Sequence, residues 1–192
     1  MNKIAVIGWG SLIWERRPKF DGCVDAWQLG GPRLPVEFCR KSSSRKNALT
    51  LVIDFELGTE VETYYAMSRR DKINDVVKDL TEREGPCIGY VDRFTGHELG
   101  NEKSIDILRK WLELKHIDGV VWTDWPSNIE PQERANFFDS WGLEYLKKLD
   151  ADGVKKAVEY IVNAPPETAT RFRASVTDDE WFKAQRLALE AL

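Results

Sequence analysis

Two short segments of this chain carry residue types and spacings that suit chemistry. The first is the apolar run Ile4–Ile7 with the glycine-flanked turn that follows it, Gly8-Trp9-Gly10-Ser11-Leu12. Glycines let a backbone come close to a ligand, and main-chain N–H groups that point together can hold a carboxylate or a phosphate. The alternative is that the glycines only end a buried strand. Residue types alone do not decide between the two.

Two other glycine motifs are excluded at this turn. A dinucleotide-binding fingerprint needs a third glycine where this chain has Ile13, and a helix after it. A nucleophile elbow needs glycines two positions before and two positions after Ser11, where Trp9 and Ile13 stand. An anion-holding turn therefore remains as the functional interpretation of this segment.

Glu84 is the second candidate, because of its place on a predicted helix. The segment 69–84 has apolar residues at helical spacing, and Glu84 falls on the same stripe as Ile73. Burial and the negative end of the helix dipole would both raise the pKa of this carboxyl, which suits a general acid or base. Neutralising it should then leave stability unchanged or higher. The alternative is an ion pair with Arg83 or Lys78 at a frayed helix end.

Weaker candidates each have a structural interpretation that is favoured over the functional one. The basic, serine-bearing segment Arg40–Lys46 could bind an anion, but a solvated loop is the more frequent case. Cys87 has no histidine near it in the sequence, which favours a structural thiol over a nucleophile. His97 and His116 are expected at the surface or hydrogen-bonded. The segment Trp122–Pro126 could stack on a base or a sugar, but packing is the simpler explanation.

Composition narrows the class of protein. The chain has 192 residues and a net charge of −4, which argues against a nucleic-acid partner. Its three cysteines and two histidines are widely spaced and predict neither a disulfide framework nor a metal site. The longest stretch without a charged residue, Ile4–Trp14, is too short to span a membrane. These features predict a cytoplasmic protein with no metal, nucleic-acid or membrane partner.

The elements that position the candidate residues follow from periodicity and turn residues. Strands are expected at 3–7, 36–40, 48–54, 61–67, 88–92 and 119–123. A hairpin turn over Phe55–Gly58 would join the third strand to the fourth, and Pro18–Pro35 would have little regular structure. Helices are expected at 69–84, 105–114, 131–149, 154–162 and 178–191, with capping boxes beginning at Ser68 and Thr177. Strands first and helices later predict a single α+β domain.

Together, the two stronger segments resemble the γ-glutamylcyclotransferase-like superfamily, and most of all its ChaC-type branch. That family has a Tyr-Gly-Ser-Leu loop after its first strand, where this chain has Trp9-Gly10-Ser11-Leu12. Its later Leu…Arg-Glu…Gly-Tyr segment is similar to Leu80…Arg83-Glu84…Gly89-Tyr90. Between them, Phe38, Ser42 and Arg45 resemble a Phe…Ser…Arg loop that is about one residue longer in the family. The resemblance covers residues 3–92.

The resemblance implies a mixed sheet partly closed into a barrel, with a substrate pocket at its mouth. It makes residues 1–125 a cyclotransferase-like core and residues 126–192 a helical C-terminal extension packed on it. Glu84 would be the catalytic acid and base. The substrate-binding residues would be Gly8, Trp9, Gly10, Ser11, Leu12 and Tyr90, with no metal or cofactor. The protein would be a monomer or a homodimer.

The implied reaction closes a ring. The α-amine of a γ-glutamyl compound attacks its own γ-carbonyl, which forms 5-oxoproline and releases an amine or an amino acid. The chain departs from the family at Trp9, which replaces a tyrosine and so changes the pocket. Two alternatives stay open: a non-catalytic γ-glutamyl-binding or interaction module, and a weaker one, an RNA or nucleotide binder that uses Arg40–Lys46.

Overall fold

The computed structural model describes residues 2–191, which form two compact units. The first unit contains the described residues up to Leu34 together with Glu62–Trp125, and the second contains Pro35–Val61 and the described residues from Pro126 onward. One change of unit along the chain falls between Trp125 and Pro126. Residues 35–61, which we assigned to the first part of the chain, belong with the C-terminal helices.

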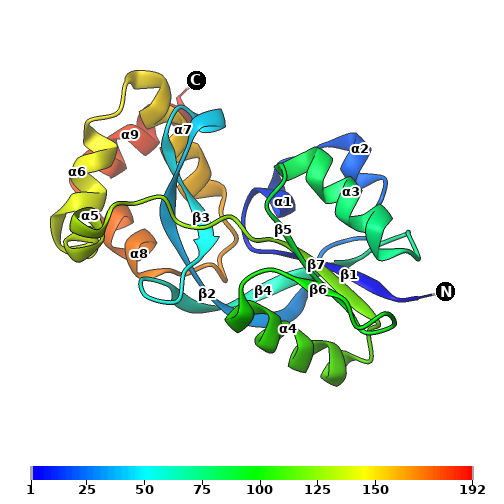
Figure 1. Cartoon of the computed structure of the whole chain (residues 1–192). Coiled ribbons are helices and arrows are strands. Elements are labelled where there is room, and N and C mark those ends of the chain that lie inside the picture. The colour runs from blue at the N-terminus through cyan, green and yellow to red at the C-terminus, as the bar shows by residue number, and fades with distance from the viewer. Residues whose placement is uncertain (1, 192) are drawn as a thin grey trace. The chain divides into compact units, whose positions relative to one another are not determined.

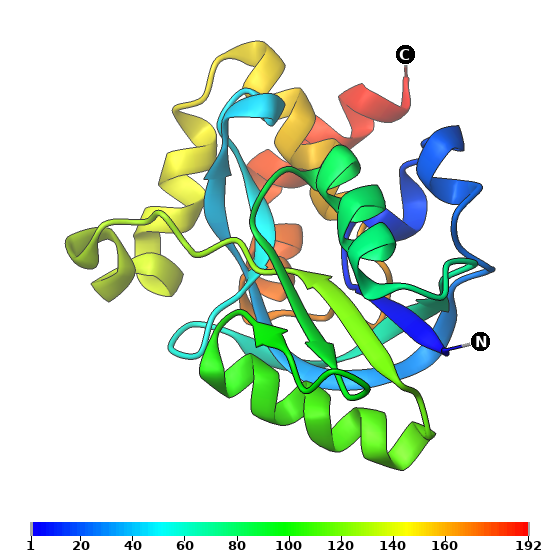
Figure 2. The ribbon, with the colours of Figure 1, turned by 45° about the vertical axis from the view of Figure 1, so that its right-hand side comes forward.

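The first unit is built on a mixed sheet. Strand β1 (Ile4–Gly8) pairs in parallel with β7 (Gly119–Thr123) and antiparallel with β4 (Thr59–Met67). Strand β5 (Ile88–Asp92) pairs antiparallel with β7 and with the two-residue β6 (Glu98–Leu99). Helices α3 (Ile73–Glu84) and α4 (Glu102–Lys115) cover opposite faces of these strands (Figures 1 and 2).

One apolar cluster in this unit supports the candidate residues. Leu12, from the short helix α1 (Ser11–Trp14), packs there with β1 and α3 side chains and with Phe20 of α2 (Pro18–Asp21). Helix α3 contributes Val76 and Leu80, and Tyr90 of β5 packs against the same cluster. The helical spacing of the apolar residues of α3 thus produces the buried face that was expected.

The second unit combines two strands with the C-terminal helices. Strands β2 (Gln28–Ser42) and β3 (Ala48–Ile53) pair antiparallel across a short 3₁₀ turn, η1 (Ser43–Arg45), and the first half of β2 belongs to the first unit. The helices are α5 (Pro131–Ala135), the π-helical turn η2 (Phe137–Trp141), α6 (Gly142–Lys147), α7 (Ala151–Asn163), α8 (Arg171–Asp178) and α9 (Glu180–Glu190). Helix α7 packs on β3 and against α9.

The chain is an α+β protein, but the sheet is open. Its strands follow the order β3-β2-β4-β1-β7-β5-β6, so β3 and β6 are edges and the expected partial closure into a barrel is wrong for the described residues. The expected hairpin between β3 and β4 is also wrong, because β2 lies between them. At Gly58 a Cβ would lie 2.6 Å from the Pro35 carbonyl carbon, so the turn after β3 passes close to the β2 backbone.

Three local expectations are corrected. Pro18–Pro35 has regular structure, since it contains α2 and the start of β2. Strand β2 tolerates Pro32, whose carbonyl accepts a 2.6 Å hydrogen bond from Thr63 Oγ1. The expected helix over 131–149 is divided into α5, η2 and α6. Neither capping box forms, since α3 begins after Lys72 with no side-chain cap and Asp179 caps α9.

Residues 2–191 contain neither a membrane-spanning helix nor a cluster of metal-binding side chains. None of their helices has the length and apolar character needed to cross a membrane. Over the same residues, no group of three or more His, Cys, Asp or Glu side chains is arranged to hold a metal ion.

Candidate functional site

The turn after β1 leads directly into α1. Gly10 precedes the helix with φ of −142° and ψ of −135°, and no described side chain caps the helix at this position. The Ile13 amide donates to the Gly10 carbonyl (3.0 Å), and the Glu15 amide donates to the Ser11 carbonyl (2.9 Å). The turn is therefore held by its own main chain, which leaves its side chains out of the capping role.

Packing explains part of the glycine pattern. A Cβ on Gly8 would lie 2.9 Å from the Trp27 ring, so glycine is needed there for the close approach of an indole. Trp9 is 4% exposed, and Ser11 and Leu12 are also buried. The alternative of a strand-ending turn thus accounts for Gly8, while the burial of Trp9 favours a packing role for its ring.

Arg83 joins the two candidate segments. It is the next-to-last residue of α3, and only 1% of its side chain is exposed. Its Nη2 donates to the carbonyl oxygens of Ser11 (3.0 Å) and Glu15 (2.8 Å), and its Nε lies 3.2 Å from Glu84 Oε1. The helix end and the turn after β1 are separated by about seventy residues in sequence, yet a single guanidinium contacts both.

The Glu84 side chain is 24% exposed and lies in an ion pair with Arg83, as the structural alternative expected. Its carbonyl accepts a 3.1 Å hydrogen bond from Trp125 Nε1, and the Trp125 ring also lies over Gly85, whose φ of +94° ends the helix. The ion pair changes one expectation. Neutralising Glu84 removes the counter-charge of a buried arginine, so stability should fall.

The electrostatics of Arg83 reflect its burial. Desolvation is the largest effect and lowers the pKa of the guanidinium, and the neighbouring positive charge of Arg17 lowers it further. The negative charges of Glu84 and Glu15 act in the opposite direction. The ion pair with Glu84 and the two carbonyl acceptors offset part of the cost of burying this charge.

Tyr90 and Gly89 belong to the same unit but have separate roles. Tyr90 is partly buried against the cluster that contains Leu12. Gly89 stands opposite Trp122 on β7, and a Cβ at that position would lie 2.3 Å from the indole. The ring covers a glycine in the neighbouring strand, so Trp122 has a packing role.

The side chains of the weaker candidates contact neighbouring residues or are at least partly buried. In the segment Arg40–Lys46, Arg40 donates to the Pro126 carbonyl (2.7 Å), Lys41 pairs with Glu133 (2.8 Å), and Arg45 lies over the Tyr160 ring. These contacts favour neither a solvated loop nor a nucleic-acid surface. Cys39 is buried and Cys87 is partly buried.

The sequence did not single out Arg83 or Trp125 as functional residues. Arg83 was considered only as a partner of Glu84, and its contacts with Ser11 and Glu15 depend on tertiary structure. The tryptophan-rich segment was noticed, but its pairing with the Glu84 carbonyl carries no signal in the sequence.

No protein-family model matches this chain, and no curated protein matches it in sequence. The resemblance to cyclotransferases therefore rests on the residues of the two segments.

Proposed function

We propose that this protein is a γ-glutamylcyclotransferase-type enzyme with Glu84 as its acid and base. The observation that supports the proposal is the position of Arg83, which contacts the Ser11 carbonyl and the Glu84 carboxylate at once. The two segments that resemble the family are thus held together by one buried side chain.

The proposed reaction needs one group that transfers a proton and a site that orients the substrate. The α-amine nitrogen of the substrate forms a bond with its own γ-carbonyl carbon, and the γ-amide C–N bond breaks. Glu84 accepts the proton that the amine loses and delivers it to the leaving nitrogen, so it ends in its starting state. Because the attack is intramolecular, orientation of the substrate supplies much of the rate.

The turn would provide that orientation. The main-chain amides of Gly10, Ser11 and Leu12 are the groups proposed to hold the γ-glutamyl end of the substrate. Glu84, which lies in the ion pair with Arg83, would accept the proton as a carboxylate. Tyr90 would border the site, while the buried Trp9 would act on the site by packing beneath it.

The experiment is a screen of γ-glutamyl compounds, with 5-oxoproline and free glutamate followed separately. Glutathione, γ-glutamyl amino acids and γ-glutamyl amines are each compared with their N-acetyl forms. Ring closure needs the free amine, so acetylation should abolish turnover, and only 5-oxoproline should appear. Release of glutamate, or equal cleavage of the acetylated compounds, would contradict the proposal.

Glu84→Gln tests the assignment of the acid and base. Turnover should fall by roughly 10²–10⁴-fold, as is typical when general acid–base catalysis is lost. Since this change also leaves Arg83 without its counter-charge, the assay is run well below the melting temperature, and the folded fraction is checked by circular dichroism. Glu113→Gln, the same change at an exposed position of α4, is the matched control and should keep full activity. Near-native turnover in Glu84→Gln would overturn the assignment.

The second candidate is a non-catalytic γ-glutamyl-binding module. The ion pair of Glu84 with Arg83 favours it, because a carboxylate in a structural pair is less available for proton transfer. This candidate predicts that 5-oxoproline binds without turnover of any γ-glutamyl compound. Calorimetric binding of 5-oxoproline, together with a negative screen, would select it over the enzyme.

A further inference from the structure

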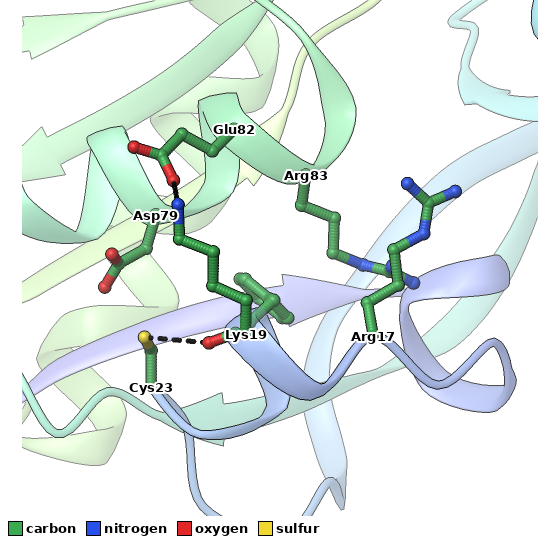
Figure 3. Close-up of a pocket in the computed structure, with 7 residues that line it drawn as sticks. Arg17, Lys19, Cys23, Asp79, Glu82 and Arg83 are labelled. Carbon is green, nitrogen blue, oxygen red and sulfur yellow. Dashed lines mark hydrogen bonds and ion pairs between the residues drawn. The ribbon is translucent and has the colours of Figure 1, made fainter.

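The charged side chains that line the cavity beside α2 and α3 in the first unit are already held in ion pairs (Figure 3). The pairs are Lys19–Glu82, Arg70–Asp79, Arg17–Glu15 and Arg83–Glu84. A charged ligand would have to displace one of these pairs to bind there.

A cavity of different character, with a volume of about 250 Å³, lies in the second unit among α6, α7 and α9. Most of its wall is apolar. Trp181 and six aliphatic side chains line it, those of Leu149, Ala151, Val154, Val158, Ala188 and Leu189. Pockets for small molecules combine an apolar wall of this kind with a few polar groups that fix the orientation of the ligand. The wall therefore suits the apolar body of a small organic molecule.

The polar part of the lining is cationic. Among the described residues that line the cavity, the polar ones are Lys147, Lys155 and Gln185, and none is acidic. A cleft that carries one sign of charge between walls of low dielectric constant attracts ligands of the opposite sign. The lining thus favours an anionic head group over a neutral or a cationic one.

Lys155 can bind such a head group without breaking an existing contact. It is exposed on α7, and it has no ion pair within the described residues. The aliphatic stem of a lysine can lie along an apolar wall while the ammonium group stays at the rim in contact with water. A carboxylate at the mouth of the cavity would meet this ammonium group.

Lys147 supplies the second cation. Its Nζ lies 6.0 Å from the centroid of the Trp181 ring, which is part of the wall. It lies 3.5 Å from Glu144 and 3.8 Å from Asp179, and both contacts are longer than a charge-assisted hydrogen bond. The Asp179 carboxylate caps α9 instead, since its Oδ1 accepts hydrogen bonds from the amides of Trp181 (2.9 Å) and Phe182 (3.4 Å). The Lys147 ammonium group therefore keeps donors for a ligand beside Trp181.

We propose that this cavity binds a small acid with an apolar body, an aryl or short aliphatic carboxylate. The body packs against Trp181 and the aliphatic wall, and the carboxylate accepts hydrogen bonds from Lys155 and Lys147. The cavity is smaller than the pockets of about 300–1,000 Å³ that hold drug-sized ligands, so the acid is small. This binding is separate from the proposed reaction, because the cavity belongs to the second unit and Glu84 to the first.

The experiment is an NMR titration of the full chain with three ligands, at an ionic strength held constant with NaCl. Phenylacetate has both the body and the charge, phenylacetamide has the same shape without the charge, and acetate has the head group alone. Phenylacetate should bind most tightly. Phenylacetamide should bind about five- to tenfold more weakly, because it loses the attraction of two lysines, and acetate at least about tenfold more weakly, because it loses the apolar contact.

Signals from the wall of the cavity locate the ligand. The indole N–H signal of Trp181, assigned with Trp181→Phe, and the methyl signals of Val154 and Leu189 should shift when phenylacetate is added. Trp122 and Val121 are buried in the first unit, and their signals should not shift.

Variants of the lysines test the role of the charge. Lys155→Met keeps the aliphatic stem, so it should raise the dissociation constant of phenylacetate about three- to fivefold and leave that of phenylacetamide unchanged. Lys147→Met should act in the same direction. Lys148→Met is the matched control, because it removes the same charge from an exposed neighbouring position that does not line the cavity. It should leave both dissociation constants unchanged.

The outcomes decide the proposal. Phenylacetate that shifts the wall signals, binds more tightly than phenylacetamide and is weakened by Lys155→Met supports it. The proposal is overturned if the wall signals do not shift, or if phenylacetamide binds as tightly as phenylacetate. It is also overturned if Lys155→Met has no effect, or no more effect than Lys148→Met. None of these results bears on the production of 5-oxoproline.

Discussion

Glu37 of β2 provides the sharpest test of the electrostatics in the second unit. It is 0% exposed, and its carboxylate accepts hydrogen bonds from the amides of Phe38 (3.0 Å) and Phe172 (3.2 Å) and from Thr59 Oγ1 (3.5 Å). Burial is the dominant effect and raises the pKa of this carboxyl from 4.5 to about 6, against the opposing effect of these bonds and of one with Thr170.

The size and sign of the effect follow from these values. A pKa of about 6 in the folded chain and 4.5 in the unfolded chain corresponds to about 2 kcal/mol. Between these two pH values the folded chain binds more protons than the unfolded chain, so stability falls as the pH rises. Near pH 7 almost the full penalty is present. Lowering the pH from 7 to 5 should therefore restore about 1 kcal/mol to the free energy of unfolding.

Two other carboxylates, those of Asp54 and Glu133, titrate outside this window. The pKa values of Asp54 and Glu133 are lowered, Asp54 chiefly by Arg134 and Glu133 by Lys41, in both cases against desolvation. Their contributions to stability are lost only as the pH falls below their unfolded-state values of 3.8 and 4.5. Of these three carboxyl groups, Glu37 is therefore the one whose titration changes the stability between pH 5 and pH 7.

The assay is urea unfolding followed by tryptophan fluorescence at pH 5, 6 and 7, for the wild type and for Glu37→Gln. Glutamine cannot titrate, so the free energy of unfolding of the wild type relative to the variant should be about 1 kcal/mol higher at pH 5 than at pH 7. Glu144→Gln, at an exposed position of α6, is the control and should follow the wild type. A difference that does not change with pH, or that changes in the opposite direction, would refute the argument.

Three further predictions concern packing and ion pairs. Gly89→Ala should cost about 1–3 kcal/mol of stability in urea unfolding, because its Cβ would overlap the Trp122 ring. Arg134→Met should cost about 3 kcal/mol in the same assay, because it leaves the buried Asp54 without its two-point ion pair (both contacts 2.8 Å). Trp9→Tyr should lower the melting temperature, since Trp9 is buried; a change in the ranking of γ-glutamyl substrates at unaltered stability would instead support a role in specificity.

Much of the first unit could be predicted from local sequence patterns. The apolar runs at β1, β5 and β7 predicted strands, and the helical spacing of Ile73, Val76 and Leu80 predicted α3. Gly85 was expected to end that helix, and its positive φ does so. These features depend on residues within a few positions of each other, and such short-range patterns can be read directly.

The order of the strands could not be predicted in the same way. Adjacent β3 and β4 suggested a hairpin, but the fifteen-residue β2 lies between them. Prolines and glycines in the first half of β2 made this segment resemble a loop in the sequence. A proline has no N–H to donate, but its carbonyl can still accept a hydrogen bond, as that of Pro32 does. Strand pairing depends on distant contacts that no local window contains.

The sequence by itself determined which residue types were available for chemistry: a glycine-flanked turn, one carboxylate on a helical stripe, and widely spaced cysteines and histidines. Only the tertiary structure decided how they are used. It placed Trp27 over Gly8, and it buried Arg83 between Ser11 and Glu84, so that the two segments share one guanidinium. The physical reason is that burial and hydrogen bonding set the charge and role of a side chain, and both depend on residues far away in the chain.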